Sequence, residues 1–218
     1  MFDGRGPAAL AWADVDARLA VLASGTGTNL QALMDDPAVG PHVALVVSDR
    51  PDATALERAR GRGIETAVCE PRDYADRAAH DRALRDLLEG KGIDCLALAG
   101  YMRIVGPELI AAFPERIVNL HPALLPAFPG MRSVADALEW GVKVTGITVH
   151  LVDEEVDHGP IVAQEPVRVL EDDDLDSLLE RVHETEHRIF PKAVRALVEG
   201  RLKVEGRVVH VLEEEGEG

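Results

Sequence analysis

The sequence predicts an α/β protein with a doubly wound, mostly parallel sheet and helices on both faces. Short apolar runs alternate with helical stretches through the first half of the chain, which is the order typical of a parallel sheet. Three of these runs lead into Gly25, Gly100 and Asn119. Because right-handed crossovers place the carboxyl ends of parallel strands at one edge, we expect the three loops to converge on one ligand crevice.

The first half contains five predicted strands and three predicted helices. Residues 95–99 are almost continuously apolar, as in a strand buried on both faces, and residues 19–23 form a similar run. The predicted strands are residues 19–23, 43–48, 65–69, 95–99 and 116–118, and the predicted helices are residues 29–34, 53–62 and 77–89. The last two helices stop at Gly63 and Gly90. Residues 107–112 are expected to form a loop.

The second half predicts longer elements. Strands at residues 145–152 and 161–169 flank a Gly-Pro loop. This arrangement favours either antiparallel pairing of the two strands or an extended segment that projects from the sheet. Residues 175–198 indicate a helix interrupted by Pro191, and its dipole favours the acidic residues that precede it. Residues 201–212 predict a hairpin. No internal repeat or low-complexity linker divides the chain, so we expect a flexible N-terminal tail, residues 1–17, and a single domain, residues 18–218.

Composition narrows the classes of partner. The formal net charge of −16 argues against a nucleic acid or an anionic membrane surface. No apolar run approaches the roughly 20 residues that span a bilayer. Cys69 and Cys95 lie in separate apolar segments without metal-like spacing, so we expect buried free thiols. These features predict a cytoplasmic protein that acts on small molecules, and a homodimer is one assembly left open.

The most informative stretch begins with Asn119 and His121, at the end of a predicted strand. Alternation along a strand directs both side chains to the same face, and the prolines that follow end the strand. A neutral donor beside a titratable base suits chemistry at a carbonyl, where one group stabilises an oxyanion and another moves a proton. The alternative is structural, with Asn119 capping a turn and His121 packed beneath it.

Residues 24–29 predict a glycine-containing loop that opens a helix. The free N–H groups of a helix N-terminus favour anions, so local dipoles can hold a phosphate even in an acidic protein. The loop is close to the dinucleotide fingerprint, and Asp49 follows at about the right distance for a ribose contact, but Leu30 replaces the third glycine. A tight turn without a ligand is the alternative.

His183 and His187 suggest an alternative function that depends on a bound metal ion. With Glu184 they form His-Glu-x-x-His on a predicted helix, the pattern of zinc hydrolases. Pro191 follows immediately, and no third ligand stands at a recognisable spacing. Taken alone, Asp157 is a turn carboxylate and His150 a structural histidine at the end of a strand.

The motif of Asn119, His121 and Pro122, followed by Leu124-Leu125-Pro126, resembles that of the formyltransferases that use 10-formyltetrahydrofolate. That family carries a later segment, Val-Asp-x-x-x-Asp-x-Gly-Pro-Ile, which is found here at residues 152–161. Residues 24–31 look like the phosphate loop of the members that formylate phosphoribosylglycinamide. The resemblance runs from about Arg18 to about Val211, nearly the whole chain.

The resemblance implies a reaction and the residues that perform it. The formyl group of the co-substrate 10-formyltetrahydrofolate would pass to the amine of phosphoribosylglycinamide, in purine biosynthesis and without a metal. Asn119 and protonated His121 would donate to the oxyanion. Asp157 would keep His121 charged and relay a proton through a water, with His150 in support.

The resemblance also implies two binding sites. The ribonucleotide would contact Gly27, Thr28, Asn29, His183 and Glu186, with His183 where the family usually has Gln. The folate would contact Arg77, Met102, Arg103, Ile104, Val105, Asn119, Asp153, Glu154, Glu155 and Val156. Three alternatives stay open: another formyl-folate-dependent transferase or hydrolase, a zinc hydrolase that uses His183 and His187, and a non-catalytic nucleotide- or folate-binding regulator.

Overall fold

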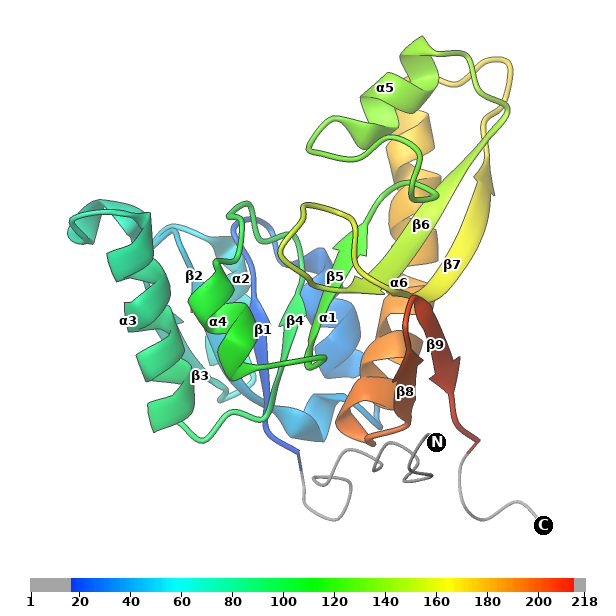
Figure 1. The fold of residues 1–218 in the computed structure, drawn as a ribbon. Coiled ribbons are helices and arrows are strands. Elements are labelled where there is room, and N and C mark those ends of the chain that lie inside the picture. Colours follow the sequence, from blue (N-terminus) through cyan, green and yellow to red (C-terminus); the bar gives the residue numbers. More distant parts are fainter. Residues whose placement is uncertain (1–16, 214–218) are drawn as a thin grey trace, which may run out of the picture.

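A computed structural model describes residues 17–213, and within that range nine strands form one sheet (Figure 1). Its order is β3-β2-β1-β4-β5-β6-β7-β9-β8. The strands are β1 (Leu19–Leu22), β2 (Val43–Ser48), β3 (Glu65–Val68), β4 (Cys95–Leu98), β5 (Ile117–His121), β6 (Val144–Leu151), β7 (Ile161–Arg168), β8 (Leu202–Glu205) and β9 (Val208–Val211). The predicted tail lies outside the described residues, except for residue 17.

Six α-helices and two short 3₁₀-helices connect the strands of this described part. The α-helices are α1 (Thr28–Asp35), α2 (Thr54–Gly61), α3 (Arg77–Gly90), α4 (Pro107–Ala112), α5 (Ser133–Glu139) and α6 (Leu175–Val198). The 3₁₀-helices are η1 (Gly40–His42) and η2 (Pro71–Asp73). None of the described helices has both the length and the apolar character needed to cross a bilayer.

The predicted α/β fold with a mostly parallel sheet is confirmed. Strands β3, β2, β1, β4 and β5 pair in parallel, in the order that right-handed crossovers produce. The long strand β6 then pairs antiparallel with both β5 and β7, which confirms the antiparallel alternative for residues 145–169. Figure 1 shows that β6, β7, α5 and the first turns of α6 extend beyond the rest of the sheet.

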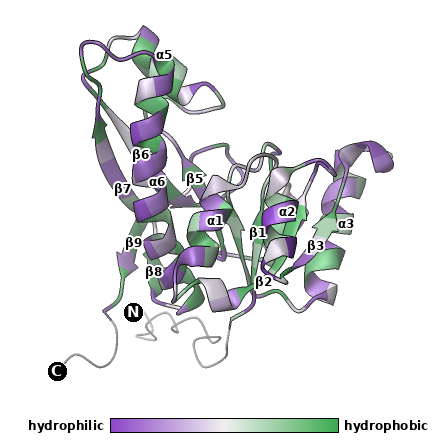
Figure 2. Ribbon diagram, turned by 180° about the vertical axis from the view of Figure 1, so that it is seen from behind, coloured by the Kyte–Doolittle hydropathy of each residue, from purple (hydrophilic) through white to green (hydrophobic). Residues whose placement is uncertain are grey.

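Two apolar layers cover the faces of the sheet. In β1, Leu19 and Val21 pack into the layer that contains α1, α2 and α6, whereas Ala20 and Leu22 pack into the layer that contains α3 and α4. All four side chains are fully buried, as the continuous apolar run predicts. Figure 2 shows β1 and β2 largely hydrophobic, while α1 and α2 mix hydrophobic and hydrophilic residues, as amphipathic helices do.

Two local predictions are wrong. Residues 107–112 are not a loop but helix α4, which Pro107 can begin because the first helical residue needs no N–H partner. Helix α6 is not interrupted at Pro191 but continues to Val198. A proline inside a helix costs about 3 kcal/mol. Here Phe190, Pro191 and Val194 are all buried, so packing against the core offsets that cost.

The loops after the central strands converge, as predicted. Leu22 is aligned with Leu98, and Leu98 with Asn119, so β1 and β4 end at the same level, and β5 continues two residues further, to His121. The backbone N–H of Ser24 donates to the carbonyl of Gly100 at 3.2 Å. Gly100 has a φ of 73°, in the left-handed region that favours glycine. The chain turns sharply there and brings the next segment beside the loop that begins at Ser24.

Candidate active site

Asn119 and His121 lie on the same face of β5, as alternation predicts. Val118 and Leu120 pack into the layer that contains α6, so the two polar side chains point to the opposite face. Asn119 is directly opposite His150 on β6, and its Nδ2 donates to His150 Nε2 at 3.1 Å. His150 Nδ1 donates in turn to the carbonyl of Leu151 at 2.8 Å. That bond leaves Nε2 free to accept, so His150 fixes the orientation of the carboxamide.

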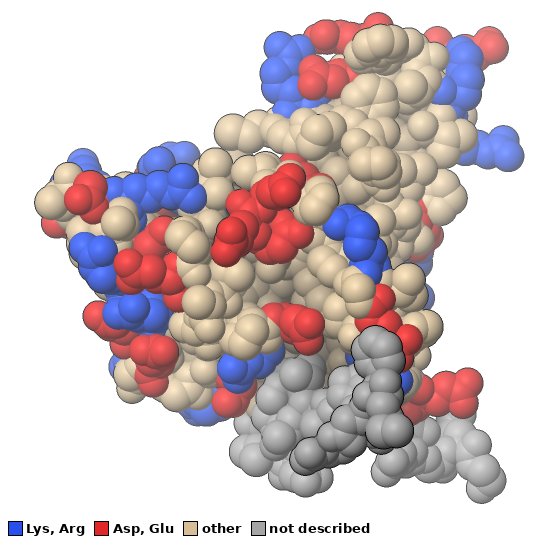
Figure 3. Space-filling model, viewed as in Figure 1, with Lys and Arg blue, Asp and Glu red and all other residues tan. Residues whose placement is uncertain are grey.

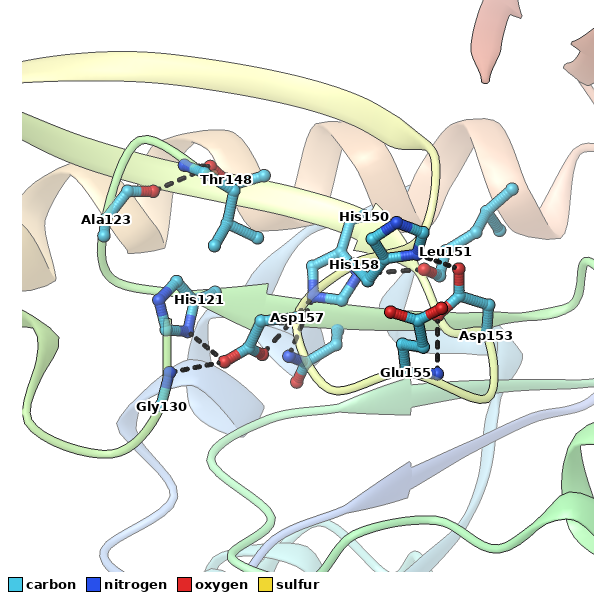
Figure 4. A network of polar contacts seen from close by, with 12 residues as sticks. His121, Ala123, Gly130, Thr148, His150, Leu151, Asp153, Glu155, Asp157 and His158 are labelled. Carbon is cyan, nitrogen blue, oxygen red and sulfur yellow. Dashed lines mark hydrogen bonds and ion pairs between the residues drawn. The ribbon is translucent and has the colours of Figure 1, made fainter. Parts of the chain in front are cut away.

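Asp157 lies between the two histidines (Figure 4). Its Oδ2 is 3.4 Å from His121 Nδ1, and its Oδ1 is 3.8 Å from His150 Nε2. Oδ2 also accepts the backbone N–H of Gly130 at 2.7 Å. The side chain of Asp157 is only 9% exposed. Residues from β5, β6 and the β6–β7 loop therefore form one polar cluster, with the two histidines buried and Asn119 and Asp157 partly buried, which unites the three predicted catalytic residues and His150.

The electrostatic balance at this cluster favours an ionised carboxylate. His150, the N–H of Gly130 and the charge of His121 lower the pKa of Asp157, although burial opposes them. The backbone N–H of Gly130 is within hydrogen-bond distance of the Asp157 carboxylate, whereas His150 Nε2, at 3.8 Å from Oδ1, is not. Burial lowers the pKa of His121, against the carbonyl of Phe128 and the charge of Asp157. The charge of Asp157 raises the pKa of His121, as expected, but burial outweighs it and the net shift is downward.

Both ring nitrogens of His121 have an oxygen neighbour. Nε2 donates to the carbonyl of Phe128 at 2.9 Å, and Nδ1 faces Asp157. The pair of Phe128 and Gly130 on the loop after β5 was not predicted, because both contribute only backbone groups, which leave no side-chain signal in the sequence. The loop itself is tied to β6, since Leu125 donates its backbone N–H to the hydroxyl of Thr148 at 3.0 Å.

The backbone of the β6–β7 loop is unusual at two residues. Asp157 has a φ of 53°, which is rare for a residue other than glycine and costs on the order of 1–3 kcal/mol. A Cβ atom on Gly159 would lie 1.8 Å from the carbonyl oxygen of Leu151. Only glycine therefore lets this loop pass so close to the end of β6. The strain at Asp157 is maintained by its contacts with Gly130 and the histidines.

The predicted phosphate loop is joined to α6. Asn29 Nδ2 donates to Glu186 Oε2 at 2.9 Å. Glu186 is 6% exposed, and burial raises its pKa, although Asn29 and the charge of His183 oppose that shift. Gly27 has a φ of 73°, and a Cβ atom there would lie 2.7 Å from Ala55 Cα. The loop is thus packed closely against α2.

A cavity of about 340 Å³ lies beside this loop, lined in part by Thr28, Arg58 and His187. The predicted ribonucleotide residues on the loop and on α6 are therefore close together, since Asn29 contacts Glu186 and the charge of His183 acts on that carboxylate. The rings of His183 and His187 stack with centroids 6.4 Å apart. Within residues 17–213 no group of three or more histidine, cysteine, aspartate or glutamate residues is placed to hold a metal ion, so the zinc hypothesis has only two ligands there.

Comparison with known proteins identifies the family. Residues 17–194 match the family described as formyl transferase. The chain belongs to the formyl transferase family. A solved glycinamide ribonucleotide transformylase 1 from Symbiobacterium toebii is 50% identical, with a TM-score of 0.87 over 90% of this chain and 94% of that one.

Curated relatives of this formyl transferase agree with that likeness. A phosphoribosylglycinamide formyltransferase of Mycobacterium tuberculosis is 47% identical over 194 residues, which are 88% of this chain and 89% of the relative. The trifunctional purine biosynthetic protein adenosine-3 of Drosophila melanogaster is 46% identical over 188 residues. Those residues are 84% of this chain but only 14% of the fly protein, so this formyl transferase corresponds to a small part of it.

The segment that was predicted to line a folate pocket in this formyl transferase follows β4. Met102 and Ile104 are 58% and 55% exposed, whereas Val105 is buried. Arg77, at the first residue of α3, donates from Nη2 to the carbonyl of Ile104 at 3.3 Å, so the structure brings Arg77 beside this segment. Arg103 donates from Nε to Asp49 Oδ2 at 2.8 Å.

Two residues hold this segment in place, and the sequence analysis did not predict that role for either of them. Asp49 was noted only for its distance from the first loop, which suits a ribose contact in an incomplete dinucleotide pattern, but its side chain is 2% exposed and pairs with Arg103. Ser24 was considered only as part of the phosphate loop, yet its hydroxyl accepts the backbone N–H of Met102 at 2.8 Å. Both follow directly after predicted strands, and this position was the signal available in the sequence.

The other predicted folate residues, Asp153 to Val156, lie on the β6–β7 loop. Asp153 accepts the backbone N–H of Glu155 at 3.0 Å and pairs with His158 Nδ1 at 2.9 Å. Arg207, from the turn between β8 and β9, donates to the carbonyl of His158. Figure 3 shows acidic side chains gathered over the middle of this face, where the loop lies. The exposed side chain of Val156 and the buried one of Asp157 are neighbours in this loop.

Proposed function

We propose that this formyl transferase moves the formyl group of 10-formyltetrahydrofolate to the amine of 5-phosphoribosylglycinamide. The products are formylglycinamide ribonucleotide and tetrahydrofolate, in the de novo synthesis of purines. The names of the relatives that match most of this chain support this acceptor. The observation that carries the proposal is the polar cluster in which Asp157 lies 3.4 Å from His121, next to the Asn119 carboxamide that His150 orients.

The proposed reaction begins with attack of the amine nitrogen on the formyl carbon. A new C–N bond forms, and the carbonyl electrons move to oxygen, where negative charge develops. Asn119 donates to this oxygen with the N–H that His150 does not accept. Protonated His121 donates from Nε2, with the oxyanion replacing the carbonyl of Phe128 as acceptor. Preorganised donors of this kind act most strongly on charge that develops in the transition state.

Proton transfer completes the reaction. Asp157, whose ionised form is favoured, accepts the amine proton through a water and returns it to N10 of the folate, where the C–N bond breaks. The developing oxyanion raises the affinity of His121 for its proton, which compensates for the burial that lowers its pKa. Each charge in this sequence has a side-chain partner, and we propose that no metal ion takes part.

We assign the two substrates to the two sides of the cluster. The ribonucleotide phosphate is held by Gly27, Thr28 and Asn29, at the N-terminus of α1. Glu186 and His183 from α6 contact the rest of the ribonucleotide. Its dianionic charge is compatible with an acidic protein because backbone N–H groups and the helix dipole act locally. The folate is held by Arg77, residues 102–105 and residues 153–156, with Asn119 at the reacting carbon.

The proposed function also bears on the domain organisation, the location and the partners of the chain. We infer that residues 18–213 form one domain that acts in the cytoplasm on these small molecules, without nucleic acid or membrane partners; residues 214–218, which we expected to belong to it, lie outside the described residues. The net charge of −16 supports this view, because it repels polyanions.

The proposal is tested by a spectrophotometric assay with 10-formyl-dideazafolate and phosphoribosylglycinamide, with and without a chelator. We expect release of the deformylated folate that requires the ribonucleotide and is insensitive to the chelator. Release without the ribonucleotide would identify a hydrolase. Activity lost with the chelator would support the zinc hypothesis. Binding of both ligands without any release would indicate a non-catalytic regulator, and release only with another amine would identify a different acceptor.

A further inference from the structure

Ser24 joins the two loops to which the proposed function assigns different substrates. Its backbone N–H donates to the carbonyl of Gly100 at 3.2 Å, and its Oγ accepts the backbone N–H of Met102 at 2.8 Å. Ser24 is 3% exposed, so its side of both hydrogen bonds is shielded from water. The residue that opens the phosphate loop is therefore bonded on both sides of Tyr101 to the segment that follows β4.

The phosphate loop is also fixed on its other side. The carbonyl of Gly25 accepts the N–H of Ala55 at 3.1 Å, and the carbonyl of Thr26 accepts Arg58 Nε at 2.8 Å. Gly27 packs closely against Ala55, where even a Cβ atom has no room. Residues 24–27 are thus held by contacts on two sides, and a ligand that restrains one part of the loop restrains Ser24 as well.

In the segment of residues 102–105, Val105 is buried in the core, whereas residues 102–104 depend on polar anchors. The side chains of Met102 and Ile104 are more than half exposed, so apolar packing contributes little to their position. The anchors are the hydroxyl of Ser24 on Met102, the carboxylate of Asp49 on Arg103, and the guanidinium of Arg77 on the carbonyl of Ile104. Of these three side chains, only Ser24 belongs to the phosphate loop.

We propose that Ser24 is a positioning residue that couples the two substrate sites, so that a ribonucleotide on the phosphate loop increases the affinity of residues 102–105 for the folate. This inference rests on the proposed function. The phosphate restrains the loop, and the hydroxyl of Ser24 transmits that restraint to the N–H of Met102. The folate then meets a segment that is already ordered, and it loses less conformational entropy on binding. Coupling of this kind is reciprocal, so the folate increases the affinity for the ribonucleotide by the same factor.

The test measures the coupling factor by calorimetry. Dideazafolate, which carries no formyl group, is titrated into the protein with and without saturating phosphoribosylglycinamide. In the unaltered protein we expect the ribonucleotide to tighten folate binding about fivefold or more, which is the lower range of typical site-to-site coupling. In Ser24→Ala, a factor close to one is expected. A factor close to one in the unaltered protein, or an unchanged factor in Ser24→Ala, would overturn the inference.

Asp49→Asn is the matched control. It weakens the anchor on Arg103 but leaves the bond between Ser24 and Met102, so folate affinity should fall while the coupling factor stays the same. A coupling factor abolished by Asp49→Asn as well would overturn a specific role for Ser24. Failure of the proposed acceptor gives a different result, because the unaltered protein would then not bind the ribonucleotide at all. Failure of the proposed catalysis alone would leave both ligands bound and the coupling factor measurable, while the formyl-transfer assay shows no release.

Hydrogen exchange gives a second measurement that needs no folate. Exchange of the Met102 amide should slow when the ribonucleotide alone is added to the unaltered protein, and it should not respond in Ser24→Ala. Circular dichroism melting of each variant shows whether it is folded. Exchange at Met102 that is unaffected by the ribonucleotide in the unaltered protein would contradict the proposed link.

Discussion

Replacing Asp157 by asparagine tests the catalytic cluster most directly. The amide retains the shape of the side chain and an oxygen for the N–H of Gly130, but it removes the negative charge near His121 and the proposed base. The charge lies 3.4 Å from His121 Nδ1. Coulomb's law at that distance gives about 5 kcal/mol for an effective dielectric constant near 20 and about 1 kcal/mol in water.

These limits bracket the expected loss of turnover. Each 1.4 kcal/mol changes a rate about tenfold, so weaker stabilisation of protonated His121 alone lowers kcat by roughly tenfold to a few thousandfold. Loss of a general base typically costs about 10²–10⁴-fold. Because one residue has both roles, the effects overlap, and we expect kcat to fall by about 10²–10³-fold. The KM values should change little, since Asp157 acts on the reacting atoms.

The assay is the spectrophotometric one with 10-formyl-dideazafolate and phosphoribosylglycinamide, repeated across the pH range. Protonated His121 is required, so activity is lost as pH rises through the pKa of His121. Removing the negative neighbour lowers that pKa further, and this loss should therefore occur at lower pH in Asp157→Asn. Asp52→Asn is the matched control, because the Asp52 side chain is 70% exposed and pairs with Arg50. Turnover near that of the control would refute the assigned role of Asp157.

Three further predictions concern catalysis, the loop and stability. Asn119→Ala removes a proposed oxyanion donor and should lower kcat by about 10²–10³-fold with little change in KM, whereas near-normal turnover would contradict the mechanism. Gly159→Ala introduces a clash with the carbonyl of Leu151, so urea unfolding should show a loss of about 1–3 kcal/mol together with reduced turnover. Arg181 lowers the pKa of Asp173 to about 2. The ionised carboxylate of Asp173 therefore stabilises the fold above about pH 4, and this contribution is lost as pH falls toward 2. The melting temperature of Asp173→Asn should lie below that of the unaltered protein at pH 7, and the two should converge near pH 2. A difference independent of pH would rule out this charge effect.

Much of the fold could be predicted from local patterns. The apolar runs at β1 and β4 are buried on both faces, and runs of that kind are legible in sequence because every position has the same environment. Asn119 and His121 were predictable for a similar reason. A strand alternates strictly, so two polar residues two positions apart must share a face. Their partner Asp157, however, came from the family resemblance and not from its own neighbourhood.

Other contacts could not be predicted, because they depend on backbone groups or on residues distant in the chain. The carbonyl of Phe128 on His121 leaves no trace in residue type. Asp49 is 54 residues from Arg103, and its spacing after the first loop favoured a ribose contact instead. The direction of the pKa shift of His121 was also unexpected, since burial is a property of the folded cluster rather than of the carboxylate beside it.

Most strands and helices, the family and its motif residues follow from the sequence, because periodicity and motifs are local, whereas helices α4 and α5 were not predicted. The tertiary structure decided which of these residues are in contact and in what electrostatic environment. Helix α6 continues through Pro191 because the core packs around it. Ser24 bonds to Met102, 78 residues away, because β1 and β4 are neighbours in the sheet and end at the same level. Contacts of this kind arise from sheet pairing and burial, which no short stretch of sequence contains.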